Sequence, residues 1–395
     1  MRIMTAMYTL RRGGAYNRFI MMLETFLERG CAVHCLSLTA IRIENPCFCN
    51  HILFYPFRNK ENSMAKLTVL LFFPLWSVWI GWRHKIDLII AFGSLYALLL
   101  SFSKWLLQKP MPTFIRGNFF FGLRMENSST ISVLLNKMVE YYGLLFSDKI
   151  ITNNSSARDE ILKRLGKRKD IDVQVLYNNI PPMSIREKED VLQTRDKYGI
   201  PGNAKVLVTA GILNRGKNIE TIIACLKKIE VENLYFLIVG DGSTEVDFRH
   251  KDSLQRLARK LEVEKQVIFT GWLEKEDLWR IYLASDLFVL PSLSEGMPNA
   301  MLEALGTGLP CMGSNIAGIK DILQYEELMF DPQGEKVLTN KIQKFFTEKQ
   351  FSDKVKRLCQ ARKEVFNFDW KEKVFEIVTS TPDNLNSAVI VDPKG

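Results

Sequence analysis

The feature that most constrains the fold is a regular alternation of two kinds of segment after residue 205. Short runs rich in Val, Ile, Leu and Phe are each followed by a segment of about helix length. Strands in strict alternation with helices predict a parallel sheet with helices on both faces. The expected strands are 206–210, 234–239, 267–269, 287–290 and 311–313, and the expected helices are 219–229, 254–261, 277–284, 299–305 and 319–323.

The first half repeats this theme more loosely. Its expected strands are 2–8, 32–38, 88–92, 113–116 and 149–152. A boundary near residues 180–200 then separates an N-terminal domain, 1–185, from a C-terminal domain, 186–365, and leaves a loose tail at 381–395. Two doubly wound α/β domains that face one another form a central cleft, and ligands bind there at the carboxyl ends of the strands.

Composition excludes several classes of protein. The chain of 395 residues is 47% hydrophobic and 25% charged, which is ordinary globular usage rather than that of a disordered, collagen-like or coiled-coil protein. Its seven cysteines form no CxxC pair, so neither a disulfide framework nor a structural zinc site is indicated. A cytoplasmic location fits best. Residues 1–10 suit a strand better than a secretory signal peptide.

Charge is concentrated in the first half. Residues 1–180 hold 23 Lys and Arg against 12 Asp and Glu, a net charge of +11, whereas residues 181–395 hold 30 against 32, a net charge of −2. A basic domain suggests an anionic partner such as a phospholipid surface, a phosphorylated substrate or nucleic acid; the alternative is a solubilising surface. Nucleic acid is not expected, because no recognition-helix or RNA-binding signature accompanies the charge.

An apolar run at 67–82 suggests what the basic half contacts. It holds sixteen uncharged residues, three Trp and two Phe among them, and is bounded by Lys66 and by Arg83. It is short for a bilayer span of about 20 residues, and Pro74 interrupts it. Aromatic residues beside basic ones are typical of a helix in a lipid interface, but a core helix of an α/β domain fits most of these side chains equally well.

The segment 294–304, SEGMPNAMLEA, carries the expected chemistry. Glu295 lies in a loop between a strand and a helix, and Pro298 suits the first turn of that helix. Backbone N–H groups between Gly296 and Asn299 and the positive end of the helix dipole would bind a diphosphate. Glu303, about one turn farther on, could accept hydrogen bonds from ribose hydroxyls, and Glu295 from sugar hydroxyls.

Four further stretches of the second half stand out beside the segment with the two glutamates: AGILNRGKN (210–218), LIVGDG (237–242), FTGW (269–272) and ASDLFVLPS (284–292). With these stretches, residues 205–330 resemble the nucleotide-binding half of the retaining glycosyltransferases of family 4, which have the GT-B fold. The first half matches more weakly, through Gly13-Gly14, 149–155 and 177–179. Trp370 resembles an aromatic residue of a closing helix, here 366–380, that packs back on the first domain.

The resemblance implies a hexosyltransferase that moves a sugar from a nucleotide diphosphate donor to a hydroxyl of an acceptor. It implies retention at the anomeric carbon, no bound metal and no cofactor, since a lysine and a helix N-terminus can neutralise the leaving diphosphate. The implied catalytic residues are Glu295, Lys217 and Arg215. The implied donor site consists of Gly14, Gly211, Lys217, Gly240, Gly242, Glu295, Gly296, Met297, Pro298, Asn299 and Glu303.

Two positions depart from the family pattern. Many members have an arginine directly after the glycine at position 211, where this chain has Ile212, so Arg215 supplies the second cation or Lys217 acts alone. Many also carry a histidine after the fourth strand of the first domain, where this chain has Arg116. Arginine cannot act as a neutral base, so Arg116 is expected to bind phosphate or the acceptor. The four histidines, at 34, 51, 84 and 250, fall in no matching motif.

The expected setting is the cytoplasmic face of the inner membrane. There the chain would act as a peripheral enzyme that binds an anionic lipid surface and extends a glycan in the biosynthesis of a cell-surface polysaccharide such as a lipopolysaccharide. The expected acceptor is lipid-linked, and a soluble acceptor is the competing case. Two alternatives stay open: a sugar-nucleotide epimerase or phosphorylase with the same fold, and a non-catalytic protein that binds membrane or glycan.

Overall fold

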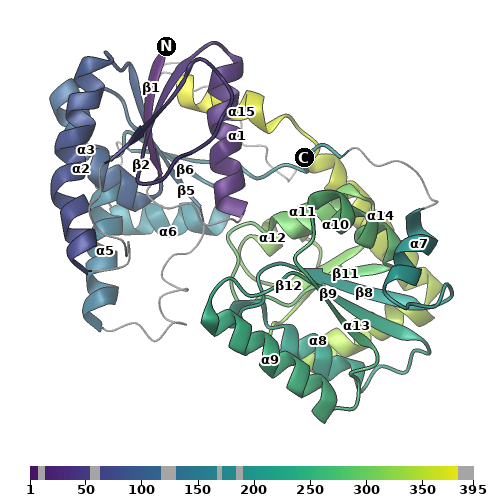
Figure 1. Cartoon of the computed structure of the whole chain (residues 1–395). Helices are drawn as coiled ribbons and strands as arrows, with labels where there is room; N and C mark the ends of the chain where they lie inside the picture. The colour runs from purple at the N-terminus through teal and green to yellow at the C-terminus, as the bar shows by residue number, and fades with distance from the viewer. Residues whose placement is uncertain (8–13, 54–62, 117–129, 167–170, 184–189, 381–395) are drawn as a thin grey trace. The chain divides into compact units, whose positions relative to one another are not determined.

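The computed structural model describes residues 1–7, 14–53, 63–116, 130–166, 171–183 and 190–380. The chain divides into two compact units, each an α/β sandwich (Figure 1). Unit 1 comprises Met1–Tyr177 and the last helix, α15 (Trp370–Thr379), and unit 2 comprises Asn178–Phe368. Two parallel sheets with helices on both faces confirm the predicted α/β class.

In unit 1 the described strands form a seven-stranded parallel sheet in the order β3-β2-β1-β4-β5-β6-β7. Its strands are β1 (Arg2–Met7), β2 (Ala32–Ser37), β3 (Phe48–Ile52), β4 (Leu88–Phe92), β5 (Pro112–Ile115), β6 (Lys149–Thr152) and β7 (Asp172–Val175). Its helices are α1 (Gly14–Glu28), α2 (Ser63–Arg83), α3 (Ser94–Leu107), α5 (Thr130–Leu145), α6 (Ser155–Leu165) and α15.

In unit 2 the described strands form a six-stranded parallel sheet in the order β10-β9-β8-β11-β12-β13. Its strands are β8 (Lys205–Ala210), β9 (Leu234–Val239), β10 (Val267–Gly271), β11 (Leu287–Leu290), β12 (Cys311–Ser314) and β13 (Met329–Phe330). Its helices are α7 (Asp190–Lys197), η1 (Arg215–Lys217), α8 (Ile219–Leu226), α9 (Glu245–Lys260), α10 (Lys275–Ala284), α11 (Asn299–Gly306), α12 (Ile319–Leu323), η2 (Glu326–Leu328), α13 (Glu335–Thr347) and α14 (Lys349–Val365).

Both sheets are doubly wound, and each reverses direction once. In unit 2 the chain runs outward from β8 through β9 to β10, then returns to β11 on the other side of β8 and continues to β13. In unit 1 the corresponding reversal lies between β1 and β4. At such a point the loops that follow two neighbouring strands diverge, which opens a crevice at the carboxyl edge of the sheet.

The predicted strands are confirmed, whereas three strands at sheet edges were not predicted. β3 and β7 end the sheet of unit 1, and β13 is one end of that of unit 2. An edge strand pairs along one side only and is often short or partly exposed, so it need not be a continuous apolar run. β3 reads FCNHI and has no fully buried residue, and β13 has two residues. Of the predicted first strand, Tyr8 lies outside the described residues, as do Gly13 and the tail 381–395.

Two helix starts also differ from expectation. α9 begins at Glu245 rather than near 254, because a reciprocal capping box between Thr244 and Asp247 starts a polar turn that has no apolar periodicity. Pro298 is the N-cap of α11 and has extended backbone angles, so it precedes the first turn instead of lying in it. The helix therefore begins at Asn299.

The last helix, α15, packs in unit 1 against α1. The rings of Phe26 and Phe375 lie 5.7 Å apart, and Lys371 forms an ion pair with Glu28. On the other side, the buried Lys149 ammonium donates to the carbonyl of Ile377 over 2.8 Å. The C-terminal segment thereby fastens both α1 and β6, two elements far from it in the sequence.

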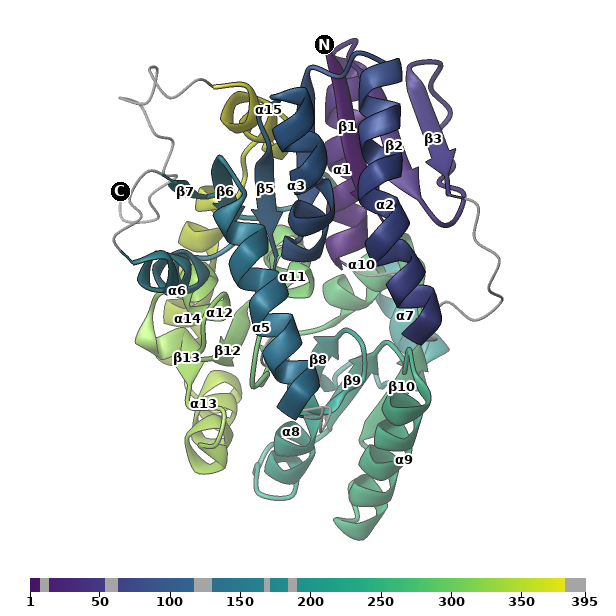
Figure 2. The same ribbon diagram turned by 90° about the vertical axis from the view of Figure 1, so that its left-hand side faces the viewer.

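Helices α2, α3 and α5 lie side by side on one face of unit 1, with α3 in the middle (Figure 2). Two glycines permit the close approach. A Cβ atom at Gly81 of α2 would lie 2.3 Å from Cδ1 of Leu107 on α3, and one at Gly143 of α5 would lie 2.2 Å from the carbonyl oxygen of Ser94 on α3. In the part of the chain that the structure describes, no helix combines the length and hydrophobicity needed to cross a bilayer.

The contact at Gly143 gives a test of this packing. Gly143→Ala forces the new methyl group against a backbone oxygen, so we expect a loss of roughly 1–3 kcal/mol in the free energy of unfolding, measured by urea denaturation. Gly202→Ala is the control, since its Cβ would meet only Cδ2 of Leu192, at 3.7 Å. Equal stability of the two variants would contradict the close α3–α5 contact.

Candidate active site

The candidate site lies at the carboxyl edge of the unit 2 sheet, where the winding reverses. β8 and β11 are neighbours in that sheet, with Leu287 beside Leu207 and Phe288 beside Val208. The loop after β8 leads through η1 into α8, and the loop after β11 leads into α11. Residues that are about 80 positions apart in the sequence are therefore brought together at this edge.

Glycines let the loops after β8 and β9 approach one another closely. Gly211 has φ 145° and Gly240 has φ 123°, values that other residues rarely adopt. A Cβ atom at Gly240 would lie 1.9 Å from the carbonyl oxygen of Gly211. The bond from the N–H of Leu213 to the carbonyl of Asp241, 3.0 Å long, closes the pair of loops. Both predicted glycines therefore shape the floor of the site through their backbone.

Lys217 and Glu295 meet above this floor. The Lys217 ammonium donates to Oε1 of Glu295 over 2.6 Å, and the hydroxyl of Ser292 donates to the same oxygen over 2.8 Å. The lysine side chain crosses Gly211 so closely that a Cβ atom there would lie 3.1 Å from its Cε. The side chains of Lys217 and Glu295 are 20% and 12% exposed, so the pair is only partly shielded from water.

Asn218 holds the two loops in this arrangement. It is buried and has φ 52°, a left-handed conformation that Asn tolerates better than most residues. Its amide donates to the carbonyl oxygens of Pro291 and Pro332, over 3.1 and 3.0 Å. The N–H of Leu293 adds a bond to the carbonyl of Gly216. The loop that carries Glu295 is thus fixed against the turn that carries Lys217.

A second asparagine and a glycine position the start of α11. The side chain of Asn178 donates to Oδ1 of Asn299 over 2.7 Å, and its backbone N–H lies 3.0 Å from the sulfur of the buried Met297. Gly318, at φ 79°, lies so close that a Cβ there would be 2.1 Å from the carbonyl oxygen of Gly296. The turn 296–299 that precedes the helix is therefore supported from two sides.

Glu303 lies on α11, half-buried rather than within the packed interior. Burial raises the pKa of the nearby Tyr282 hydroxyl well above its usual value, and the negative charge of Glu303 raises it further. The Glu303 carboxylate is therefore close enough to Tyr282 of α10 to affect its pKa. Glu303 lies on α11, and Glu295 lies in the loop that precedes the same helix.

Two other predicted site residues, Arg215 of the catalytic set and Gly242 of the donor set, lie at the margin of this arrangement. Arg215 is exposed at the start of η1, and its charge acts on His250, whose pKa is lowered first by burial. Gly242 serves packing: a Cβ there would lie 2.7 Å from the backbone nitrogen of Phe248 in α9. The hydrogen bonds described above, which hold Lys217 and Glu295 in place, involve neither Arg215 nor Gly242.

The two predicted residues of unit 1 lie near the carboxyl edge of its own sheet. Gly14 is exposed and begins α1. Arg116 follows β5, and its guanidinium lies over the rings of Trp370, at 5.6 Å, and Phe92, at 5.8 Å. Arg18 of α1 lies over the same Trp370 ring at 5.2 Å. Burial and then the charge of Arg18 lower the pKa of Arg116 to about 9, so it stays protonated at neutral pH.

Sequence reasoning named Lys217 and Glu295 but missed the residues that hold them: Ser292, Asn218 and Asn178. Asn178 was noted only as part of the 177–179 segment. The position of Asn218 could have been predicted from the sequence, since an asparagine directly before an amphipathic helix suits a left-handed turn. Arg18 lies one turn inside a helix, and no sequence pattern there predicts a functional residue.

The pairing of Lys217 with Glu295 is open to a direct measurement. A double-mutant cycle of Lys217→Met and Glu295→Gln, followed by urea unfolding, is expected to give a coupling free energy on the order of 1 kcal/mol, because both side chains are much less exposed than those of a surface ion pair. The pair Lys227 and Glu262, 51% and 81% exposed, serves as the control and should give less. Strict additivity at 217 and 295 would contradict the contact.

Comparison with known proteins agrees with this architecture. HepE from Anabaena, solved with UDP, superposes with a TM-score of 0.78 at 17% identity over 96% of this chain and 100% of its own. This likeness confirms the predicted GT-B fold. Among curated proteins, the UDP-Gal:alpha-D-GlcNAc-diphosphoundecaprenol alpha-1,3-galactosyltransferase of Escherichia coli is 30% identical over 52% of this chain and 52% of its own. The N-acetyl-alpha-D-glucosaminyl L-malate synthase of Bacillus anthracis is 28% identical over 48% and 47%.

These matches span about half the length of both curated relatives. The family model described as glycosyl transferases group 1 matches residues 190–364, which include β8, β11, the turn of Lys217 and the loop of Glu295. Over these residues, which are less than half of the chain, this protein is similar to the glycosyl transferases group 1.

Proposed function

We propose that this protein is a retaining hexosyltransferase of family 4 that moves a sugar from a nucleotide diphosphate to a hydroxyl of a glycan acceptor. The observation that carries the proposal is the contact of Lys217 with Glu295 beside the N-terminal turn of α11, at the winding reversal of unit 2. A cation, a carboxylate and a helix N-terminus at one sheet edge suit a ligand that combines a diphosphate with a polyol.

The chemistry follows from the charges. As the bond between the sugar and the diphosphate breaks, negative charge grows on the leaving oxygen, and groups already in place to bind that charge lower the barrier. The Lys217 ammonium and the backbone N–H groups at the start of α11 are such groups. Asn218 and Asn178 fix the backbone turns that carry these groups, so that backbone is already in place. In this proposal they carry out the leaving-group stabilisation without a metal ion.

The carboxylates recognise hydroxyls. In the structure Oε1 of Glu295 accepts from both Lys217 and Ser292. A bound diphosphate would compete for the ammonium, and the Glu295 carboxylate would then accept hydrogen bonds from the donor sugar. Glu303, farther along α11, is assigned to the ribose.

In unit 1 Arg116 is assigned to an anionic group of the acceptor or of the donor phosphate. It is protonated at neutral pH and cannot serve as a general base. Its guanidinium and that of Arg18 lie over one indole ring, which fixes two positive charges near the carboxyl edge of β5. Gly14, at the start of α1, is assigned to a close backbone approach to the diphosphate.

The relatives suggest the substrates. HepE was solved with UDP and with UDP-glucose, and the name of the galactosyltransferase specifies a diphosphoundecaprenol-linked acceptor. We therefore propose a UDP-sugar as the first donor to test and a lipid-linked glycan of a cell-surface polysaccharide as the acceptor.

Donor turnover by purified protein tests the assignment. Incubation with UDP-, GDP- and ADP-sugars should release one nucleoside diphosphate selectively. Lys217→Ala should lower kcat by roughly 100-fold or more, by analogy with loss of one charge-stabilising donor, and Glu303→Ala should mainly raise KM for the donor. Lys356→Ala and Glu264→Ala, at exposed positions of the same unit, are the matched controls.

If the Lys217 and Glu303 variants turn over donor as fast as these controls, the site assignment is wrong. Retention is tested separately by the anomeric configuration of the product in NMR. An inverted product would contradict the retaining mechanism alone.

We also propose that unit 1 binds the cytoplasmic face of an anionic inner membrane. The outward sides of α2, α3 and α5 expose a set of large apolar side chains, and the basic residues Arg83, Lys104 and Lys137 lie on the same helices. Such a mixture suits a lipid interface. The exposed apolar residues are Leu71, Phe72, Leu75, Trp79, Trp82, Leu95, Phe102, Trp105, Leu106, Leu134, Leu135, Met138, Tyr141 and Tyr142.

Liposome flotation tests this surface. The protein should float with anionic vesicles at low salt, and the double variant Trp82→Ser/Trp105→Ser, at positions 73% and 72% exposed, should lose most of that binding. Trp272→Ser, 56% exposed in unit 2, is the matched control and should float as wild type does. Equal flotation of both variants, or none by wild type, would contradict the proposed surface.

A further inference from the structure

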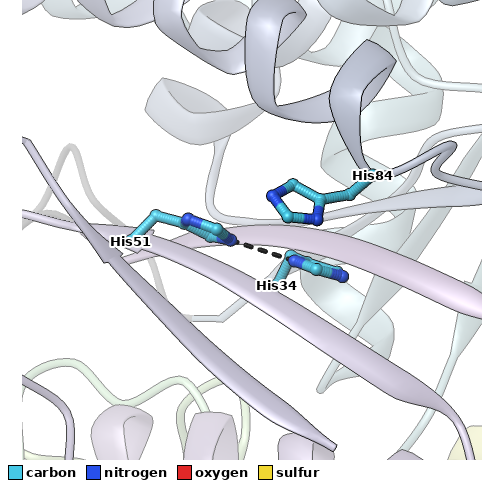
Figure 3. A group of neighbouring side chains, drawn as sticks. All are labelled: His34, His51 and His84. Carbon is cyan, nitrogen blue, oxygen red and sulfur yellow. Dashed lines mark hydrogen bonds between the residues drawn. The ribbon is translucent and has the colours of Figure 1, made fainter.

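Three of the four histidines in the sequence gather in unit 1, although 17 and 33 positions separate neighbours along the chain (Figure 3). His34 lies on β2, His51 on β3, and His84 directly after α2. Parallel pairing of β2 and β3 sets His51 beside Leu36, two positions along from His34 and on the same face of the sheet. The end of α2 brings His84 over both.

The ring nitrogens converge. One ligand atom from each of the three histidines lies within 4.8 Å of the others. Nδ1 of His34 and Nε2 of His51 are 2.9 Å apart and form a hydrogen bond, drawn as a dashed line in Figure 3. The ring of His84 lies with its centroid 4.3 Å from that of His34 and 5.1 Å from that of His51.

The protonation state suits metal binding. Burial, followed by the neighbouring charges of His84, His51 and Arg2, lowers the pKa of His34 to about 4, and burial also lowers the pKa of His51. Both rings are therefore neutral at pH 7, and each has one nitrogen lone pair. A shift of the donor ring to its other tautomer moves its proton to the far nitrogen, so both facing nitrogens become available to a metal ion.

We propose that His34, His51 and His84 bind a divalent transition-metal ion of the zinc class. Imidazole nitrogens are ligands of Zn²⁺, Ni²⁺ and Cu²⁺, whereas Mg²⁺ and Ca²⁺ require oxygen. Zinc holds nitrogen about 2.0–2.1 Å from the metal, so ligand nitrogens lie on the order of 3.4 Å from one another in a tetrahedral site. The spacings in the structure, 2.9 Å between the nitrogens of His34 and His51 and at most 4.8 Å among all three ligand atoms, lie on either side of that value.

The ion would fasten the edge of the unit 1 sheet. β3 is the edge strand, and its other ties to β2 are the ladder and the side chain of Asn50, which donates to the carbonyl of Cys35 and to the hydroxyl of Ser37. A bound ion would join β3, β2 and the end of α2 in one cluster. The positive charge of Arg2, which acts on His34, opposes binding and sets a limit on affinity.

The test uses the full chain after removal of metals with a chelator. Titration with Zn²⁺ against a chromophoric chelator should show one ion bound per chain, and thermal unfolding should shift upward by a few degrees at saturation. His51→Gln and His84→Gln, at half-buried positions, should each weaken binding at least about tenfold and abolish the thermal shift. His250→Gln, the fourth histidine, lies in unit 2 and should bind as wild type does.

Co²⁺ provides a readout that does not depend on any variant. Substitution of Co²⁺ in wild type should give the strong visible absorption of a four-coordinate ion, and Mg²⁺ should neither bind nor compete. Absence of stoichiometric Zn²⁺ binding to wild type would overturn the proposal, as would equal affinity of the His51→Gln and His250→Gln proteins.

Discussion

The reversal of winding between β8 and β11 is the constraint on which the candidate active site depends. β10 and β11 follow one another in the sequence but lie on opposite sides of β8, so the loops after β8 and β11 emerge side by side at one edge. Lys217 on the first loop then meets Glu295 on the second at 2.6 Å. The buried Asn218 spans both loops, and the glycines at 211 and 240 allow the close approach of the backbone beneath them.

The hydrogen bonds between the side chains of this site can be replaced by hydrogen bonds to a ligand. Glu295 accepts hydrogen bonds from the Lys217 ammonium and from the Ser292 hydroxyl. Both donors could turn to a bound ligand. Because neither side chain of the ion pair is fully buried, this movement would not leave an unpaired charge in an apolar interior. The supporting asparagines, by contrast, are buried and bound to backbone carbonyls or to α11. The groups assigned to substrate can therefore move, while the groups that position them cannot.

Much of this could be predicted from the sequence, for identifiable reasons. Strands buried on both faces read as continuous apolar runs, so β8, β9 and β11 were found, whereas the edge strands β3 and β13 lack that signal. Lys217 and Glu295 were named from their motifs, but no local pattern shows that two residues 78 positions apart touch. The histidine cluster was missed for the same reason, because its residues converge only through the pairing of β2 with β3 and the end of α2.

Binding of a nucleoside diphosphate compared with its nucleoside tests the central claim most directly. We take the nucleotide preferred in the donor panel and measure both ligands by calorimetry with wild type and Lys217→Ala. If Lys217 binds the diphosphate, the substitution weakens binding of the diphosphate at least about tenfold, the equivalent of 1.4 kcal/mol, and leaves binding of the nucleoside unchanged. Equal affinity of both proteins for the diphosphate, or an equal loss for both ligands, would contradict the account.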